Sequence, residues 1–250
     1  MSAHHPSELA AARGEPSYVW RKGQERRLRM VGHWATLQNA RVLEAGCGVG
    51  MYSSQIRRRY SPHVEAFDVE LARVKEARTD TPHALVAAAE ALPYRDDLFD
   101  TIISNEVIEH VQDDRLAVQE MVRVLKPKGR IVLFCPNRWY PVEQHGHYWK
   151  GRYHFGNTPL INYLPDRWRN KLAPHVRTYT ARGVRRLFDG LPVRIVHQSR
   201  IFGGYDNIIR RYPRAGRLLR DTLYALERTP FRFFGLSHWL VVEKLPPSER

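Results

Sequence analysis

The sequence predicts an α/β fold in which helices cover both faces of a doubly wound, mostly parallel sheet of seven strands. Three observations support this prediction. Short apolar runs alternate with helical patterns between residues 41 and 135, a glycine cluster follows the first run, and two further strand patterns lie near the C-terminal end. In a fold of this class, ligands bind in the crevice beyond the carboxyl ends of the strands.

The elements up to the third strand follow in chain order. Residues 1–16 contain two prolines and little hydrophobic pattern, which predicts a flexible N-terminal arm. Residues 17–250 are expected to form a single domain, and its first helix is expected to begin near Ser17. The next elements are expected at 41–45 (strand), 51–60 (helix), 63–68 (strand), 71–78 (helix) and 84–88 (strand).

The fourth and fifth strands are expected at 99–105 and 130–135, on either side of a helix. Asp113 and Asp114 can cap the N-terminus of this helix, and its apolar residues recur every three or four positions. The sequence KPKG, which contains a proline and a glycine, is expected to end the helix before the fifth strand begins.

Two segments interrupt the remaining pattern. Residues 136–179 hold nine aromatic residues and four histidines but little periodicity, and a structureless loop of this length is uncommon in a compact domain. We therefore expect a folded lid inserted after the fifth strand. Residues 203–235 hold seven arginines and three acids and are expected to form a basic amphipathic insertion. The other elements are expected at 180–188 (helix), 193–198 (strand) and 239–244 (strand).

Composition restricts the class and the compartment. The 250 residues are 43% apolar, which is enough for a sizeable core without disulfides. No apolar run approaches the roughly 18–20 residues that span a bilayer, the N-terminus lacks the apolar region of a secretory signal, and two cysteines make no disulfide framework. A soluble, cytoplasmic protein is expected. The net charge of +14 attracts phosphate-rich partners, or reflects a basic composition without a binding role.

The glycine cluster EAGCGVG after the first strand is the main binding motif. Glycines at 46, 48 and 50 allow a tight turn and close approach of a ligand, but Met51 breaks the dinucleotide pattern G-x-G-x-x-G. Glu44 stands before the turn, where it would repel a pyrophosphate and suit a positively charged ligand group. Asp68 ends the second strand, where an acid can accept both hydroxyls of a ribose.

Four segments resemble the successive motifs of class I S-adenosylmethionine-dependent methyltransferases, and are most similar to the small-molecule branch that includes ubiquinone-pathway enzymes. They are EAGCGVG, FDVE, AEALPYRDDLFDTIISNEVIEHV and EMVRVLKPKGRIVLFCPN, and together they cover about residues 40–137. The resemblance implies the Rossmann-like methyltransferase fold and S-adenosyl-L-methionine as cofactor. It leaves the substrate open.

The resemblance also implies cofactor contacts at particular positions. The methionine half would lie against the turn after the first strand, the ribose against Asp68 and the adenine against residues that follow the second and third strands. Many members have an aspartate at position 88, where this chain has Ala88. The implied cofactor-binding residues are Glu44, Gly46, Cys47, Gly48, Gly50, Asp68, Val69, Ala89, Glu90 and Asn105.

The sequence EVIEH after the fourth strand places Glu106, Glu109 and His110 on one face if the segment opens a helix. Three interpretations compete. His110 is a general base oriented by a carboxylate, or the three side chains bind a divalent ion together with His145 or His147, or the group is structural. Small-RNA 2′-O-methyltransferases and some quinone O-methyltransferases have a similar E-x-x-E-H group. A divalent metal is compatible with the sequence but is not expected.

The lid and the basic insertion each admit two interpretations. The lid can wall an acceptor pocket, with Arg138 or Arg152 holding an anionic group, or its aromatic residues can form the core of a small subdomain. The basic insertion can contact a membrane surface, or it can pack on the domain with solvated arginines. The lid side chains proposed for the pocket are Trp139, Tyr140, His145, His147, Tyr148 and Trp149.

The leading function is S-adenosylmethionine-dependent O-methylation of a hydroxylated small molecule, which can be lipid- or glycan-linked. One alternative is an RNA methyltransferase acting on the 2′-hydroxyl or a base, which the net charge favours, although no RNA-binding module is recognisable. The other is a non-catalytic, cofactor-binding partner subunit. A small-molecule acceptor is thus the expected partner. A nucleic acid partner is less favoured, contact with a membrane surface is an alternative, and the sequence leaves the oligomeric state open.

Overall fold

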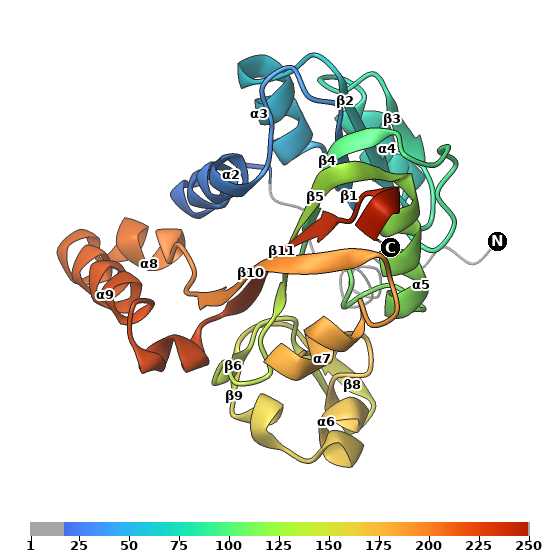
Figure 1. The fold of residues 1–250 in the computed structure, drawn as a ribbon. Coiled ribbons are helices and arrows are strands. Elements are labelled where there is room, and N and C mark those ends of the chain that lie inside the picture. Colours follow the sequence, from blue (N-terminus) through green and yellow to red (C-terminus); the bar gives the residue numbers. More distant parts are fainter. Residues whose placement is uncertain (1–17, 250) are drawn as a thin grey trace.

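A computed structural model describes residues 18–249, and its central feature is one seven-stranded sheet (Figure 1). The strand order is β10-β11-β5-β4-β1-β2-β3. All neighbouring strands are parallel except β11, which runs antiparallel to both β5 and β10. The doubly wound, mostly parallel sheet is therefore confirmed. Its strands are β1 (Val42–Ala45), β2 (Val64–Asp68), β3 (Ala84–Val86), β4 (Phe99–Asn105), β5 (Leu125–Pro136), β10 (Val193–Ile201) and β11 (Ser237–Lys244).

Helices cover both faces of the sheet, because alternate residues of its central strands are buried on opposite sides. In β1, Val42 packs with one group of helices and Leu43 with the other, and Ile103 and Ile102 of β4 divide in the same way. One face carries α2 (Lys22–Trp34), α3 (Met51–Arg59) and α4 (Leu71–Ala77), and the other carries α5 (Asp114–Val124) and α7 (Ala181–Arg186).

The strand order reverses between β1 and β4. From β1 the chain adds β2 and β3 on one side, and then β4 and β5 on the other, so the connections leave in opposite directions at this point. A crevice opens at the carboxyl ends of strands where the winding reverses. The turn after β1 and the turn after β4 both lie at this edge of the sheet.

Two local expectations are wrong, and one condition set in the sequence analysis is not met. The first helix of the described residues begins at Lys22, not near Ser17, and the expected arm at 1–16 lies outside those residues. The fifth strand begins at Leu125, because Leu125 already pairs with Phe99, and the KPKG sequence lies within the strand where the pairing with β4 is irregular. The residues after β4 form a turn and not a helix. The expected cap is confirmed, because the Asp113 carboxylate accepts from two amides of α5.

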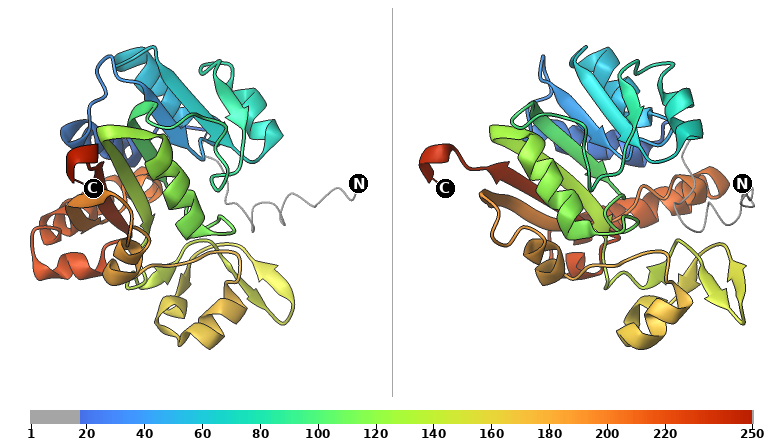
Figure 2. Two further views of the ribbon diagram at one scale, coloured as in Figure 1. Left: turned by 45° about the vertical axis from the view of Figure 1, so that its right-hand side comes forward. Right: turned by 90° about the vertical axis from the view of Figure 1, so that its right-hand side faces the viewer.

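The segment between β5 and α7, residues 136–179, folds into small elements beside the sheet (yellow in Figure 2). The buried Arg169 organises it. Its guanidinium donates to the carbonyls of Ala173 and Val176, at 3.3 and 2.5 Å, and to Glu143 at 3.2 Å. The elements are β6 (Val142–Glu143), β7 (His147–Trp149), β8 (Arg152–His154), β9 (Thr158–Pro159), η1 (Ile161–Tyr163) and α6 (Asp166–Leu172).

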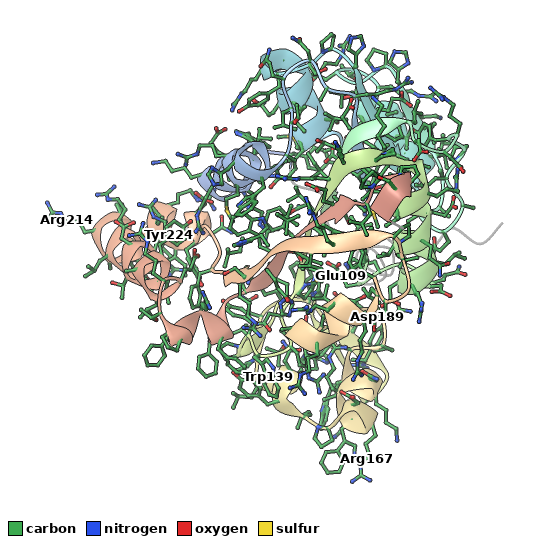
Figure 3. The ribbon with its side chains drawn as sticks, in the orientation of Figure 1. Glu109, Trp139, Arg167, Asp189, Arg214 and Tyr224 are labelled. Atoms are coloured by element: carbon green, nitrogen blue, oxygen red, sulfur yellow. The ribbon has the colours of Figure 1, made fainter. Side chains whose placement is uncertain are left out.

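A second segment, residues 203–235, connects β10 to β11 and is called the arm here. Figure 3 labels Arg214 and Tyr224 on it, away from the sheet. The arm is attached to α2, because Glu227 forms an ion pair with Arg26 and accepts from the Phe202 amide. Within residues 18–249, no helix is long and apolar enough to cross a membrane. The arm contains α8 (Asp206–Arg211), α9 (Pro213–Leu226) and η2 (Pro230–Phe234), and the C-terminal η3 (Pro247–Glu249) follows β11.

The turn after β1 depends on glycine for packing within the protein. Gly46, Gly48 and Gly50 have φ of +63°, +53° and +80°, the left-handed region that favours glycine. A Cβ on Gly46 would lie 2.5 Å from Cγ2 of Val107, in the turn after β4. The two turns that face each other across the crevice are therefore in tight contact.

Gly46→Ala should lower the free energy of unfolding by about 3 kcal/mol, because the new methyl group collides with Val107 in addition to the cost of a left-handed alanine. Gly190→Ala is the matched control. Gly190 has φ of +79° but open space where the Cβ would lie, so only the backbone cost of about 1 kcal/mol applies. Urea denaturation measures both variants, and equal losses would contradict the packing role of Gly46.

Candidate active site

A cavity of about 1020 Å³ opens at the carboxyl ends of β1, β2 and β4. This volume lies at the upper end of the roughly 300–1,000 Å³ typical of ligand pockets. The turns after β1 and β4 line the cavity. Residues of the segment inserted between β5 and α7 (136–179), called the inserted segment below, line it from the opposite side. The lining side chains from that segment are Gln144, His145, Tyr153 and Phe155.

Most of the cofactor-binding residues inferred from sequence line this one cavity. Gly50 is not among the lining residues. It stands at the N-cap of α3, and a Cβ there would lie 3.1 Å from Cα of Ala77. The close packing of the N-terminus of α3 on Ala77 of α4 therefore explains why position 50 is a glycine. The predicted residues that do line the cavity are Glu44, Gly46, Cys47, Gly48, Asp68, Val69, Ala89, Glu90 and Asn105.

Two carboxylates that line the cavity near the turn after β1 can bind a ligand. Glu44 is buried and accepts from the Ser53 amide at 2.7 Å, and no ion pair neutralises it within the described chain. Burial, and to a smaller extent Asp68, raises the pKa of Glu44 to about 8. Asp68 accepts from the Gly48 amide at 2.9 Å and keeps the capacity to accept further hydrogen bonds. A cationic group near Glu44 and hydroxyls near Asp68 would therefore fit.

Two other predicted residues are engaged within the protein. Oδ1 of Asn105 accepts from Arg27 of α2 at 2.5 Å, so the Asn105 amide is held from outside the cavity. Oε1 of Glu90 accepts from the amides of Gln112 and Asp113, at 2.7 and 3.2 Å. Glu90 thus stabilises the turn that precedes α5 as well as lining the cavity.

The turn after β4 separates the three residues of the EVIEH sequence. Glu106 has a left-handed φ of +57°, and its carboxylate pairs with Arg27 at 2.9 Å and accepts from Ser237 at 2.6 Å. Burial opposes ionisation of Glu106, but Arg27 and Ser237 outweigh it and lower the pKa. Glu106 is therefore an ionised residue that holds the turn to α2 and β11, and it does not share a helix face with His110.

Glu109, His110 and His145 converge at the cavity. Each offers one ligand atom, and these atoms lie within 4.8 Å of one another. Glu109 is 1% exposed, and neither carboxylate oxygen has a hydrogen-bond partner among the described residues. Burial, together with the charge of Glu106, raises the pKa of Glu109 well above its usual range. Burial and the neighbouring His145 lower the pKa of His110 to about 4.

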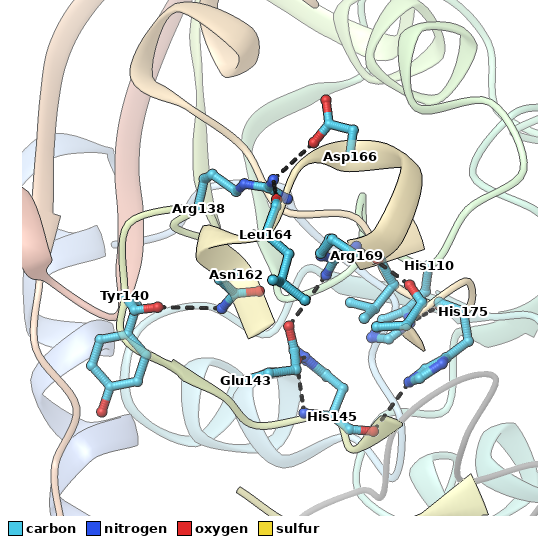
Figure 4. Close-up of polar contacts among 12 residues, drawn as sticks. His110, Arg138, Tyr140, Glu143, His145, Asn162, Leu164, Asp166, Arg169 and His175 are labelled. Atoms are coloured by element: carbon cyan, nitrogen blue, oxygen red, sulfur yellow. Dashed lines mark hydrogen bonds and ion pairs between the residues drawn. The ribbon is translucent and has the colours of Figure 1, made fainter. Parts of the chain in front are cut away.

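The inserted segment fixes the orientation of His145 (Figure 4). Nδ1 of His145 lies 2.8 Å from Oε1 of Glu143, and the other oxygen of Glu143 accepts from Arg169. Burial opposes ionisation of Glu143, but His145 and Arg169 outweigh it and lower the pKa to about 2. Nδ1 of His110 faces the His175 carbonyl at 3.4 Å. Nε2 is therefore the nitrogen that each imidazole leaves for a ligand.

The other lid residues proposed for an acceptor pocket have different positions. His147 bonds to Thr158 at 2.9 Å and stacks on His154. Arg138 bonds to the Leu164 carbonyl and pairs with Asp166, and Tyr140 lines a separate cavity of about 170 Å³ behind His145. Trp139, Tyr148, Trp149 and Arg152 do not line the large cavity.

Sequence reasoning missed several residues of the site. Arg27 comes from a helix that precedes the first motif, and no pattern marks it. Tyr153 and Phe155 line the cavity, and the Tyr153 hydroxyl donates to the His145 carbonyl at 2.6 Å. The density of aromatic residues in the inserted segment is a signal for a wall, but it does not select these two.

Known proteins resemble the region that builds this cavity. Residues 43–133 match a family described as "Methyltransferase domain". A ubiquinone biosynthesis O-methyltransferase of Xylella fastidiosa is 32% identical over 119 residues, which are 45% of this chain and 48% of that protein. A malonyl-[acyl-carrier protein] O-methyltransferase of Salmonella typhimurium is 39% identical over 94 residues, 37% of each chain. The chain spans about half the length, or less, of these curated relatives.

Solved structures support the fold over most of the chain. An S-adenosylmethionine-dependent methyltransferase from Mesorhizobium loti has a TM-score of 0.63 at 17% identity and covers 89% of this chain and 98% of its own. The [4+2]-cyclase SpnF has a TM-score of 0.60 at 17% identity, with 96% and 92% covered. The resemblance to class I S-adenosylmethionine-dependent methyltransferases is thus confirmed, while the second structure illustrates that the fold alone does not fix the reaction.

Glu109→Gln should stabilise the protein increasingly as the pH rises from 5 to 8. The folded pKa of Glu109 is raised above its unfolded value, so folding keeps the carboxyl protonated where the unfolded chain ionises it. The free energy of unfolding of the wild type therefore falls by up to about 1.4 kcal/mol for each pH unit above about 4.5. The glutamine variant has no carboxyl to ionise at this position and avoids this loss.

Urea denaturation at the two pH values measures the difference, and the exposed Glu76→Gln is the control that should change little at either. Urea denaturation repeated with added Mn²⁺ tests for a cation at Glu109, His110 and His145. A bound ion would raise the free energy of unfolding of the wild type and leave that of Glu109→Gln unchanged. A pH-independent difference would contradict the raised pKa of Glu109.

Proposed function

We propose that this chain is an S-adenosyl-L-methionine-dependent methyltransferase that transfers the methyl group to a hydroxyl of a small molecule. The observation that carries the proposal is one cavity lined by the turn after β1, Asp68, His110 and His145, with the buried Glu109 carboxylate within 4.8 Å of the two imidazoles. Residues that fit the cofactor and two imidazoles that can accept a proton therefore line the same cavity.

The residues that line the cavity near the turn after β1 fit the cofactor. Glu44 would pair with the ammonium of the methionine half, which removes the cost of a buried carboxylate without a cation. Asp68 would accept the ribose hydroxyls while it holds the Gly48 amide. When bound, the cofactor supplies a methyl group on a sulfonium centre. Alignment of this methyl group with the attacking oxygen in a closed pocket accounts for much of the rate.

The cluster would receive the proton of the acceptor hydroxyl. His110, the base inferred from sequence, has a pKa near 4 and is a weak base in the free protein. His145 is better supported, because the Glu143 carboxylate faces its ring N–H and stabilises a positive charge on the ring. We assign the proton to His145, while His110 lies beside it and contacts the acceptor, and Glu106 positions the turn through Arg27.

A second role is favoured by the unpartnered oxygens of Glu109. Three potential ligand atoms that lie within 4.8 Å of one another form a suitable site for a divalent cation once Glu109 loses its proton, although none was expected from the sequence. Glu109, His110 and His145 would hold it, with Glu143 orienting His145 as second-sphere carboxylates do. A cation there would lower the pKa of the acceptor hydroxyl.

The acceptor is proposed to be a small molecule with an apolar or aromatic part. Tyr153 and Phe155 line the cavity on the side of the cluster, and the cavity volume lies at the upper end of the range of ligand pockets. The two relatives described above carry the name O-methyltransferase, which supports oxygen as the methylated atom.

Asp68→Ala should weaken binding of S-adenosylhomocysteine at least tenfold, since the variant loses an acceptor for the ribose and the hydrogen bond to Gly48. Calorimetry measures the affinity, and Asp221→Ala, an exposed acid of the arm, is the control. Asp68→Asn keeps one acceptor oxygen and should lie between the two. Unchanged affinity in Asp68→Ala would sink the ribose assignment, and a flat wild-type titration would sink the proposed function.

His145→Ala and His110→Ala should each slow methyl transfer at least tenfold and leave S-adenosylhomocysteine affinity within about twofold, because both side chains act on the acceptor. The readout is incorporation of labelled methyl groups into a metabolite extract. His147→Ala is the matched control, since His147 lies in the same segment but outside the cluster.

Full activity in both variants would contradict the proton role. The same assay in EDTA separates the two roles of the cluster. Activity that is lost and then restored by Mg²⁺ or Mn²⁺ would assign Glu109, His110 and His145 to a cation, and unaffected activity would assign them to direct proton transfer.

A further inference from the structure

The arm carries an apolar stripe on the solvent-facing side of α9. Ala215, Leu218, Leu219, Thr222 and Ala225 recur at i, i+3, i+4, i+7 and i+10, so they share one face of the helix, and all five are exposed. Leu218 is 70% exposed. A surface helix ordinarily turns such a stripe toward the core, and here it points away from the protein.

The opposite side of α9 explains why the stripe cannot turn inward. Gly216 packs against the backbone of Ile209 in α8, where a Cβ would lie 2.7 Å from its Cα. The Tyr224 ring lies under the Arg26 guanidinium of α2, with 3.8 Å from Cζ to the ring centroid. The contacts of α9 with α8 and α2 therefore fix its orientation and leave the apolar stripe outside.

Further large apolar side chains are exposed on both sides of α9 in the chain. Tyr212 precedes the helix, and η2 follows it with Phe231 and Phe234. Phe231 is 60% exposed. Monomeric soluble proteins rarely expose this many large apolar side chains within one short segment, and such a surface indicates a binding partner.

The charge of the arm identifies the chemistry of that partner. All three acids are engaged within the protein: Asp206 with the Gly23 amide, Asp221 with Arg220 and Glu227 with Arg26. Six exposed arginines have no acidic partner within residues 18–249. They are Arg210, Arg211, Arg214, Arg217, Arg228 and Arg232.

We propose that the arm docks on the surface of an anionic lipid bilayer. The stripe of α9 and the phenylalanines of η2 enter the boundary between headgroups and acyl chains, and the six arginines pair with lipid phosphates. A second copy of this chain fits less well, because two identical basic faces repel each other. RNA would pair with the arginines but gains nothing from the aliphatic side chains of Leu218 and Leu219.

The arm lies next to the entrance of the cavity. Arg21, the N-cap residue of α2, and Gln24 of α2 line the cavity, and the Gly23 amide between them donates to Asp206 of the arm at 3.2 Å. Phe233 of η2 stacks on Trp139 of the inserted segment, with 5.4 Å between ring centroids. Docking of the arm would therefore bring the cavity close to the lipid surface. If the proposed function also holds, an acceptor with a lipid tail could be presented from the bilayer.

Vesicle flotation tests the docking on the full chain. The wild type should bind phosphatidylcholine vesicles that contain phosphatidylglycerol at least tenfold more tightly than phosphatidylcholine alone. Leu218→Asp should weaken this binding at least tenfold because it places a charge in the stripe. The double variant Arg214→Glu/Arg217→Glu should weaken it similarly, whereas Arg185→Glu/Arg186→Glu, which makes the same charge change on α7, should have less than a threefold effect.

Three results would overturn the proposal: no preference for anionic vesicles, full binding by Leu218→Asp, or dimerisation of the wild type through the arm in light scattering that Leu218→Asp abolishes. Tighter binding to single-stranded RNA than to anionic vesicles would overturn it in favour of nucleic acid. S-adenosylhomocysteine affinity, measured on the same variants, should be unchanged. This affinity measurement separates a failure of docking from a failure of the proposed function, because Leu218 and Arg214 lie outside the cavity.

Discussion

Parallel pairing of β1 with both β2 and β4 is the constraint on which the rest of the structure depends. Because the winding reverses between β1 and β4, the turns that follow these two strands meet at one edge of the sheet. The contact between Gly46 and Val107 joins the two turns directly. The cavity, the acids on its wall and the contact with the inserted segment all follow from this juxtaposition.

The carboxylates of the site fall into two classes. Glu106 and Glu143 are paired with Arg27 and Arg169, so burial is offset and both are ionised. Glu44 and Glu109 line or adjoin the same cavity without a cation, and burial raises the pKa of each. The first pair holds the architecture of the site. The second pair costs stability in the free protein, which is the expected property of groups that await a ligand.

The fold was largely predictable from local chemistry. Alternating burial of Val42 and Leu43 on a strand between two helical layers, and the Asp113 cap of α5, follow from side-chain period and hydrogen-bonding capacity. The side of the cavity formed by the turn after β1 and Asp68 was predictable for the same reason, since its residues lie within one motif or at strand ends. Gly50 is the exception, because close packing on Ala77 gives the same residue type as close approach to a ligand.

The side of the cavity formed by the turn after β4 and the inserted segment was less predictable because it depends on contacts between distant segments. The left-handed backbone of Glu106 turns the EVIEH sequence away from a helix, and it is stabilised by Arg27 and Ser237, which lie far away in the chain. His145 joins Glu109 and His110 only because the inserted segment folds around Arg169 and Glu143. Neither interaction has a periodicity or a spacing that a single sequence displays.

The most direct measurement of the central claim is an experimental structure of the chain with S-adenosylhomocysteine bound. We expect the ribose at Asp68, the ammonium at Glu44 and the sulfur directed toward the open space beside Glu109, His110 and His145. A ligand bound elsewhere, or bound with its sulfur directed away from these three side chains, would contradict it.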